Sequence, residues 1–460
     1  MTNNVLTIDF GSTYTKAILL DLESELIMSH ITVNTQSKTN LFDSYQELIT
    51  KMAEDLKIEQ LPNHQTLICS SAFGGFNMVA IGLTHSLTTA AAKKVALGAG
   101  TRILKTFSYS LSSADIQKIN QLNPDVILLT GGTDGGNTAF ILDCAQKLTH
   151  LNKDIPLIVA GNRLAAPEIK RILMNRTYYL TENVLPKVNL IQATDTRERL
   201  RRIFFEKIIY GKGFDQIAKL SNSPIIPTPM AVLHAVKLLS QGSGKIPGFG
   251  KITLVDVGGA TTDVHSACES ISDQQLLYEG LPEPFLKRTV EGDLGMRYSA
   301  VSLFETAGPD YFNIYGNHHY DETELRRNCL LREQHPDFIP STPDQSDFDN
   351  LMAKIAVSIG MDRHAGVTRR ERHPRHDTYY QQGKDLRQID LLIGTGGIII
   401  NSSQPKNILK AALQTDTQHL KPLKPAFYLD SSYIVSSLGL LAEHHPQVAL
   451  RMLTKYLIPL

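Results

Sequence analysis

Residues 5–16 read Val-Leu-Thr-Ile-Asp-Phe-Gly-Ser-Thr-Tyr-Thr-Lys, and residues 252–263 read Ile-Thr-Leu-Val-Asp-Val-Gly-Gly-Ala-Thr-Thr-Asp. In each stretch an apolar run predicts a buried strand that ends in Asp, followed by a hairpin of Gly and hydroxyl residues. A strand running into Asp-x-Gly is common, so one copy alone is compatible with an ordinary tight turn. Two copies, one near the start of each half of the chain, predict a duplicated fold with two loops that grip one polyphosphate.

The first hairpin carries residue types that bind phosphate and a metal ion. Gly11 lets the backbone approach a phosphate closely, and the hydroxyls of Ser12 and Thr13 donate to its oxygens together with backbone N–H groups. Lys16 adds a positive charge nearby. Asp9 stands at the end of the strand and suits Mg²⁺ held through water, because this ion prefers carboxylate oxygens and loses its water reluctantly.

The second hairpin repeats these features. Its phosphate-binding candidates are Gly258, Gly259, Thr261 and Thr262. Asp256 takes the position of Asp9, and we expect the two carboxylates to share one Mg²⁺ ion. Hydrolysis also needs a water molecule held in line with the terminal phosphate, and Thr13, Thr262 or Asp263 is suited to hold it. The candidate catalytic residues are therefore Asp9, Thr13, Asp256, Thr262 and Asp263.

A third glycine-rich segment lies at Gly394-Thr395-Gly396-Gly397, within an apolar stretch at 390–400 that predicts a buried strand continuing after the glycines. The segment lacks the lysine of a P-loop, which argues against that mode of phosphate binding. Standing alone it would be an ordinary glycine turn. Because it follows two phosphate hairpins, we expect the four residues to form a flat floor for a purine and its ribose. The expected ligands are thus a purine nucleotide and Mg²⁺.

Composition narrows the class of protein. A chain of 460 residues exceeds one ordinary hydrophobic core, so at least two domains are expected. The 46 basic and 46 acidic side chains cancel, which leaves no global field to favour nucleic acid or an anionic membrane as a partner. The four cysteines are far apart, and neither a signal peptide nor a long apolar span is evident. We expect a cytoplasmic, soluble protein with reduced cysteines.

The pattern along the chain predicts how the domains are organised. The glycine-rich segment 241–250 favours a boundary there, giving a first half at 1–245 and a second half at 246–460. Apolar runs at 125–130, 156–160 and 178–184 alternate with helical segments, which predicts a small α/β subdomain with a parallel sheet inserted at about 124–190. The loop at 131–137 either receives an anion or forms a tight turn. The basic run at 368–377 favours a solvated surface loop over a partner-docking patch.

The order of these motifs resembles the superfamily of actin, sugar kinases and DnaK-type chaperones. The resemblance implies an α/β fold in which two ribonuclease-H-like, actin-type ATPase domains flank a nucleotide cleft and close on ATP and Mg²⁺. Fold alone does not name a substrate.

Other segments resemble one family more closely. They are 70–83, 96–100, 129–137, 289–299, 362–366 and 383–386. Together with the two hairpins they are similar to the glutamate mutase accessory family, called MutL or GlmL and unrelated to the mismatch-repair protein of that name. The resemblance covers residues 5 to about 441, while the loop at 307–350 and the basic run match nothing in it.

That family accompanies adenosylcobalamin-dependent carbon-skeleton mutases and aminomutases, and the resemblance implies an ATP-dependent reactivating chaperone. Such a protein would couple ATP binding and slow hydrolysis to the release of damaged cobalamin from the mutase subunits. Two alternatives stay open. One is a small-molecule kinase of the same superfamily, with Asp263 as its base, and the other is a scaffold protein that binds nucleotide without hydrolysing it. A hydantoinase-like hydrolase rests on overall fold similarity alone.

Overall fold

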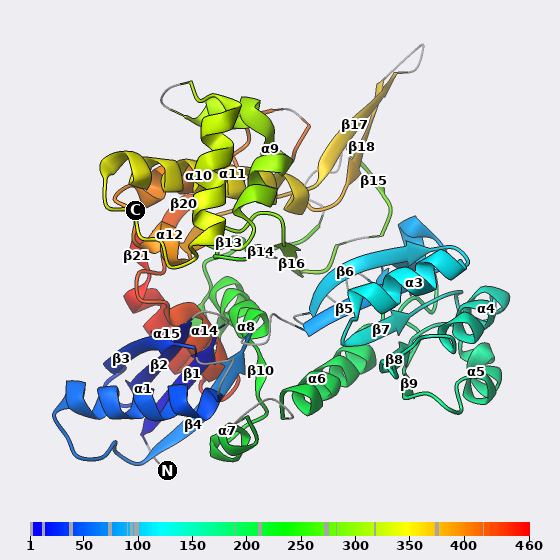
Figure 1. The fold of residues 1–460 in the computed structure, drawn as a ribbon, viewed down its shortest axis with the longest axis horizontal. Coiled ribbons are helices and arrows are strands. Elements are labelled where there is room, and N and C mark those ends of the chain that lie inside the picture. The colour runs from blue at the N-terminus through cyan, green and yellow to red at the C-terminus, as the bar shows by residue number, and fades with distance from the viewer. Residues whose placement is uncertain are drawn as a thin grey trace. The chain divides into compact units, whose positions relative to one another are not determined.

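The chain divides into two compact units, unit 1 (Met1–Val232) and unit 2 (Leu233–Leu460) (Figure 1). The computed structural model describes residues 3–11, 14–35, 40–71, 76–89, 91–92, 95, 101–188, 190–209, 214–270, 276–281, 283–316, 319–372, 377–416 and 418–460.

Unit 1 begins with a mixed sheet whose spatial order is β10-β4-β1-β2-β3. Its strands are β1 (Asn4–Phe10), β2 (Tyr14–Asp21), β3 (Leu26–Asn34), β4 (His64–Ser70) and β10 (Ile226–Pro227). Strands β1, β2 and β3 pair antiparallel, whereas β4 runs parallel to both β1 and β10. Helices α1 (Leu41–Leu56) and α7 (Phe214–Leu220) pack together, with α1 against β2 and β3. Nearly all of β1 is buried, as expected for a central strand.

Unit 2 contains a sheet with the order β16-β14-β13-β19-β20-β21. Its strands are β13 (Ile252–Val257), β14 (Thr262–Ala267), β16 (Leu286–Glu291), β19 (Leu391–Thr395), β20 (Ala426–Leu429) and β21 (Ile458–Pro459). Strands β13, β14 and β16 pair antiparallel, whereas β13, β19 and β20 run parallel.

The two sheets share one topology. If the strands of each sheet are numbered in chain order, the sheet of unit 1 has the spatial order 3-2-1-4-5, and the sheet of unit 2 repeats this order for its first five strands. In both, three antiparallel strands are followed by two parallel ones, and unit 2 adds β21 as a sixth, antiparallel edge strand. Each predicted motif supplies the first strand of its sheet and the start of the second, and the two strands pair antiparallel. This repetition confirms the duplicated α/β fold predicted from the paired motifs.

The second sheet of unit 1 is entirely parallel and has the order β6-β5-β7-β8-β9. Its strands are β5 (Phe76–Gly82), β6 (Thr101–Ser108), β7 (Val126–Leu129), β8 (Leu157–Val159) and β9 (Tyr178–Leu180). The three predicted strands and their parallel pairing are confirmed. Because β5 and β6 belong to the same sheet, residues before 124 also form part of it. The domain bounds at 124–190 and at residue 245 stay predictions.

Helices cover this parallel sheet. Side chains of α3 (Ser113–Leu122), α4 (Ala139–Leu148) and α5 (Ala166–Ile172) share one apolar core with β5, β7 and β8. Helix α6 (Thr194–Ile209) follows β9, and short helices occur at η1 (His85–Thr89) and η2 (Arg163–Ala165). In chain order the strands stand 2-1-3-4-5, one of the two common doubly wound arrangements.

A helical layer packs on the sheet of unit 2. It contains α9 (Ala300–Tyr315), α10 (Glu322–Gln334) and α11 (Pro343–His364), and α11 lies against β13, β14 and β16. The segment 307–350 was expected to be a loop, and this is wrong: most of it is helical. Pro343 stands in the first turn of α11, where proline is well tolerated, and Pro309 follows a kink in α9 at Gly308. The remaining helices are α8 (Thr228–Gln241), α12 (Gly397–Ile400), α13 (Pro405–Leu409), η3 (Lys410–Ala412), α14 (Ile434–Leu441) and α15 (Pro446–Tyr456).

Unit 2 also has two small sheets. Strands β11 (Gly242–Ser243) and β12 (Ile246–Pro247) form a short hairpin, and β15 (Leu277–Glu279), β18 (Asp377–Gln382) and β17 (Val367–Arg372) form the other sheet. The solvated loop expected at 368–377 is therefore wrong for its described residues, which lie in β17 and β18. The paired Arg and Tyr side chains of these strands stabilise an extended conformation that net charge alone does not predict.

The strand expected to continue through 390–400 ends at Thr395 instead, and α12 begins at Gly397. Gly396 separates them with φ +94° and ψ 147°, a conformation that only glycine adopts readily. The premise that the strand continues straight after the glycines is therefore wrong, although the segment still lacks the P-loop lysine. Among the described residues, no helix is both long and apolar enough to cross a bilayer.

Candidate functional site

Asp9 lies near the end of β1 and is 7% exposed. It stands opposite Lys16 of β2, so both side chains lie on one face of the sheet. The Thr228 hydroxyl donates to its Oδ1 at 2.6 Å. Cys69 of β4 is its parallel neighbour, and burial, followed by the charge of Asp9, raises the pKa of that thiol well above its usual range. Asp9 is thus a fixed, largely buried carboxylate next to a lysine.

Gly11 is a steric requirement of the first hairpin. Its N–H donates to the carbonyl oxygens of Asp9 at 3.1 Å and Tyr14 at 3.0 Å. A Cβ at position 11 would lie 2.5 Å from the Tyr14 carbonyl oxygen, which no real Cβ tolerates. Ser12 and Thr13 lie outside the described residues, so their predicted phosphate contacts stay predictions.

Asp256 occupies the same place in unit 2 that Asp9 occupies in unit 1. It lies near the end of β13, is partly exposed, and has Thr395 of β19 as its parallel neighbour. A Cβ at Gly396 would lie 2.8 Å from the Asp256 Oδ1 and 2.3 Å from the Val257 carbonyl oxygen. The second hairpin and the Gly-Thr-Gly-Gly turn therefore meet at the Asp256 carboxylate.

Asp263 stands opposite Asp256 across the antiparallel pair. Its Oδ1 accepts hydrogen bonds from Arg288, at 2.8 Å from Nε, and the Arg288 Nη2 lies 2.6 Å away. Its Oδ2 accepts from the Thr261 hydroxyl at 3.0 Å. Arg288 is only 5% exposed, so it compensates the Asp263 charge in a partly dry environment. Asp263 is therefore held in place between Arg288 and Thr261.

The backbone of the second hairpin has its carbonyl groups occupied and several N–H groups open. The N–H groups of Met296 and Arg297 donate to the carbonyl oxygens of Gly258 at 3.0 Å and Gly259 at 2.7 Å. Within the described part of the chain, the N–H groups at positions 259, 260 and 261 have no acceptor. Several N–H groups in one turn form a concave site for an anion.

Thr262 differs from its neighbours. Its hydroxyl is fully buried and donates to the Leu294 carbonyl oxygen at 2.7 Å. This contact directs the hydroxyl into the core and away from the open N–H groups. The role predicted for Thr262 in phosphate binding or water positioning stays a prediction that this geometry does not favour.

Packing and hydrogen bonding account for several residues of the Gly-Thr-Gly-Gly turn. A Cβ at Gly394 would lie 2.9 Å from the Leu409 side chain, and a Cβ at Gly397 would lie 3.1 Å from the Tyr433 hydroxyl. The Thr395 hydroxyl donates to the buried Asp430 at 3.0 Å. A nucleoside floor at 394–397 stays a prediction.

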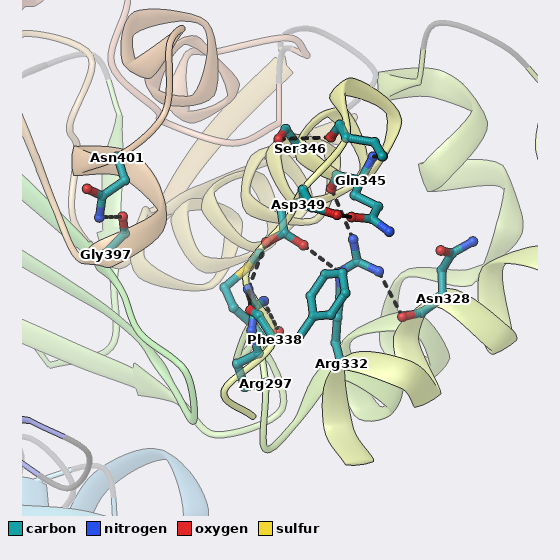
Figure 2. Close-up of polar contacts among 12 residues, drawn as sticks. Arg297, Asn328, Arg332, Phe338, Gln345, Ser346, Asp349, Gly397 and Asn401 are labelled. Atoms are coloured by element: carbon teal, nitrogen blue, oxygen red, sulfur yellow. Dashed lines mark hydrogen bonds and ion pairs between the residues drawn. The ribbon is translucent and has the colours of Figure 1, made fainter. Parts of the chain in front are cut away.

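A buried ion network supports the second hairpin from behind (Figure 2). Arg297 donates to the Asp349 Oδ2 at 2.8 Å, and the Asp349 Oδ1 pairs with Arg332. Arg332 is fully buried, and its guanidinium lies 4.6 Å from the Phe348 ring centroid. Because residues 296 and 297 also hold the hairpin carbonyls, this network links the hairpin to α10 and α11.

Sequence reasoning missed several residues that shape the site: Thr228, Arg288, Arg297, Arg332, Asp349 and Asp430. The only local signal was Pro-Thr-Pro at 227–229, which predicts a helix start. The others are recognised only through partners far away in the sequence.

Within the described residues, one further group of potential metal ligands lies together, formed by Asp362, Asp416 and His419. The His419 Nδ1 is 2.9 Å from the Asp416 carboxylate. The Lys421 ammonium, 1% exposed, is 2.8 Å from the Asp362 carboxylate. Lysine thus already supplies the positive charge, and we interpret the group as an ion-pair network.

The family model described as MutL protein matches residues 5–457. The chain belongs to the MutL family. The curated Protein MutL of Clostridium tetanomorphum is 41% identical over 459 residues, which cover 98% of this chain and 99% of that protein. These matches confirm the glutamate mutase accessory family that the sequence resembles.

Similarity to solved structures is much weaker. Nucleotide-free acetone carboxylase matches 96% of this chain and 70% of its own, with 11% identity and a TM-score of 0.43. The match to gluconate kinase from Lactobacillus acidophilus covers 99% of this chain and 92% of the kinase chain, with 10% identity and a TM-score of 0.36. The match to the activator of 2-hydroxyisocaproyl-CoA dehydratase from Clostridium difficile, with bound ADPNP, covers 97% of this chain and 97% of the activator chain. The identity is 9% and the TM-score is 0.33. Scores this low carry no conclusion about this MutL-family chain.

Proposed function

We propose that this MutL-family protein is an ATP-dependent accessory protein that reactivates an adenosylcobalamin-dependent mutase of the glutamate mutase or aminomutase type. ATP binding and slow hydrolysis would be coupled to release of damaged cobalamin. One observation carries the nucleotide part of the proposal. Each unit has an Asp near the end of the first strand of its own sheet, at equivalent positions, and each Asp is closely followed by a glycine of the hairpin.

The residues of unit 2 fit a phosphate and a hydrated Mg²⁺ ion. The open N–H groups at 259–261 suit phosphate oxygens, and the partly exposed Asp256 carboxylate suits an ion that keeps most of its water. In unit 1, Lys16 lies on the same face as Asp9 and adds a positive charge. Bound Mg²⁺ would supply neutralisation of the charge on the phosphoryl oxygens.

Family membership supports the mutase as the partner, and a physical argument supports the use of ATP. A mutase that has lost its deoxyadenosyl group retains a tightly bound, inactive cobalamin, so its release requires a change of conformation. A ligand shifts a conformational equilibrium only by its difference in affinity for the two states. Moving a ratio from 1:99 to 99:1 takes about 5.5 kcal/mol, which is within the reach of a tightly bound nucleotide.

Calorimetry with ATP and Mg²⁺ tests nucleotide binding on the full chain. We expect Asp256→Asn and Asp9→Asn each to weaken ATP binding at least about tenfold, which is about 1.4 kcal/mol. Glu59→Gln, at an exposed position outside both hairpins, is the matched control and should bind as the wild type does. Absence of ATP binding by the wild-type protein would refute the proposal.

A second experiment separates the accessory protein from the small-molecule kinase. ADP release is measured with a cobalamin-inactivated mutase, with the active mutase, and with a panel of small hydroxyl and carboxylate acceptors. The proposal expects stimulation by the inactivated mutase alone. Pairing of Asp263 with Arg288 argues against the kinase, whose catalytic base Asp263 would have to be. ATP turnover that depends on a small acceptor would favour the kinase. Reactivation of the mutase that is unchanged in Asp9→Asn and Asp256→Asn would favour the scaffold protein.

A further inference from the structure

Strands β17 and β18 form an arm that extends from the rest of unit 2 (Figure 1). We define the arm as residues 367–372 and 377–382. Strand β18 lies in the middle of its small sheet, with β15 on one side and β17 on the other. Strand β17 is therefore an edge strand.

The base of this edge already pairs with another segment of the chain, near residues 418–419. The Thr368 N–H donates to the Gln418 carbonyl oxygen at 2.8 Å, and Val367 forms an antiparallel bridge with His419. The Thr368 N–H thus points away from β18. Because backbone groups alternate along a strand, those of Arg370 and Arg372 point the same way. No described residue pairs with these groups.

Side chains make this edge selective for charge. Arg370 pairs with Asp377 and lies 5.9 Å from the Tyr379 ring. Arg372 is exposed and has no ion partner among the described residues. Arg370, Arg372 and Tyr379 share one face, because Arg370 stands opposite Tyr379 and Arg372 opposite Asp377. That face carries two guanidinium groups against one carboxylate.

Charge complementarity identifies the kind of partner. Charged side chains on an edge strand commonly prevent it from pairing with another strand. By this rule, the β17 edge should not pair with the same edge of a second copy of this chain. Antiparallel pairing of two β17 edges would bring arginines together, which is destabilising. An extended segment that carries carboxylates would instead pair with the same arginines. The outward backbone groups that a further strand would meet are those of Arg370 and Arg372, about 7 Å apart along the strand.

We propose that an acidic, extended segment of the mutase adds to the β17 edge as a further strand. This inference rests on the proposed function and names the surface through which the mutase is bound. Backbone hydrogen bonds to Arg370 and Arg372 hold the segment, and their guanidinium groups select its carboxylates. The arm is a docking surface and takes no part in ATP binding.

Surface plasmon resonance with the purified mutase as the probe tests this inference on the full chain. R370E/R372E reverses the charge and should weaken mutase binding at least about tenfold. Lys118→Glu with Arg327→Glu makes the same change in net charge at exposed positions outside the arm and should leave binding unchanged. Binding by the wild type should also weaken as salt increases, because exposed charges are screened.

A second pair of variants tests strand addition itself. Arg370→Ala removes the side chain, whereas Arg370→Pro removes the side chain and the outward N–H. Proline is tolerated on an edge strand where its N–H faces outward. We expect Arg370→Pro to bind the mutase at least about fivefold more weakly than Arg370→Ala. Hydrogen exchange of residues 377–382 checks that β18 keeps its pairing in both variants.

The outcomes separate the two proposals. If the wild type binds the mutase and R370E/R372E binds it equally well, the arm inference is wrong and the proposed function stands. If Arg370→Pro binds as tightly as Arg370→Ala, strand addition is wrong. If the wild type binds ATP but no mutase in any nucleotide state, the proposed function fails, and the arm inference fails with it.

Discussion

Gly396→Ala is the substitution that the structure singles out most sharply. The backbone at this position, with φ +94° and ψ 147°, costs about 1–3 kcal/mol for a residue with a side chain. The new Cβ would also lie 2.3 Å from the Val257 carbonyl oxygen and 2.8 Å from the Asp256 Oδ1. Relief of that overlap requires the turn or β13 to move, which adds about 1–3 kcal/mol. We expect a total loss of about 2–6 kcal/mol in the free energy of unfolding.

Gly308→Ala is a matched control in the same unit. Gly308 has φ 71° and ψ 164°, in the same glycine-only region, but a Cβ there meets nothing within 4 Å. Only the backbone cost of about 1–3 kcal/mol applies. The difference between the two variants thus isolates the overlap with Asp256 and Val257.

Two measurements follow. Urea unfolding is monitored by far-UV circular dichroism, because the chain has no tryptophan. ATP binding is measured by calorimetry in the presence of Mg²⁺ and without urea. Displacement of Asp256 should lower the ATP affinity of Gly396→Ala at least about tenfold, whereas Gly308→Ala should keep the wild-type affinity. Equal losses of stability in the two variants, or unchanged ATP affinity in Gly396→Ala, would refute the reasoning.

Three further substitutions have definite expected outcomes. Asp349→Ala leaves Arg332 buried without its carboxylate and should lower the free energy of unfolding by about 3–5 kcal/mol in urea titrations, whereas Arg332→Met should cost less because Asp349 keeps its second arginine. Thr228→Val removes the hydrogen bond to buried Asp9 and should cost about 1–3 kcal/mol, with weaker ATP binding by calorimetry. Burial lowers the pKa of Lys384 from 10.5 to about 8, so the unfolded chain binds more protons between these values. The free energy of unfolding should therefore rise from pH 8 to 10.5, by up to about 1.4 kcal/mol per pH unit, in the wild type relative to Lys384→Met.

The sequence predicts the two hairpins well because each is a local pattern. An apolar run, a terminal Asp and a glycine turn together specify a strand and its reversal within about a dozen residues. The stretch after Gly396 shows where such reasoning fails. Ile398, Ile399 and Ile400 have the β-branched side chains typical of strands, yet they form α12. Gly396 ends the strand, and packing of Ile399 in the core overrides its preference.

The remainder of the site was not predictable because it depends on distant partners. Thr228 is separated by 219 positions from Asp9, whose carboxylate accepts its hydrogen bond. Arg332 and Asp349 lie on two helices in a segment expected to be a loop, and both residue types are usually on the surface. Only the folded chain shows that a buried arginine pairs with a buried aspartate behind the hairpin.

The two halves share a topology but differ in charge at equivalent positions. The residue opposite the first Asp is Lys16 in unit 1, whereas in unit 2 it is Asp263, and Arg288 compensates its charge. Equal folds therefore present unequal electrostatics, and a fold alone does not fix the role of a site. On the proposed function, the lysine of unit 1 suits the phosphate oxygens, whereas the Asp256 carboxylate of unit 2 suits the hydrated metal ion. Lys16→Met should then weaken ATP binding with and without Mg²⁺, whereas Asp256→Asn should weaken it only when Mg²⁺ is present. If Mg²⁺ changes the loss of ATP affinity equally in Lys16→Met and Asp256→Asn, this division of roles between the two halves is wrong.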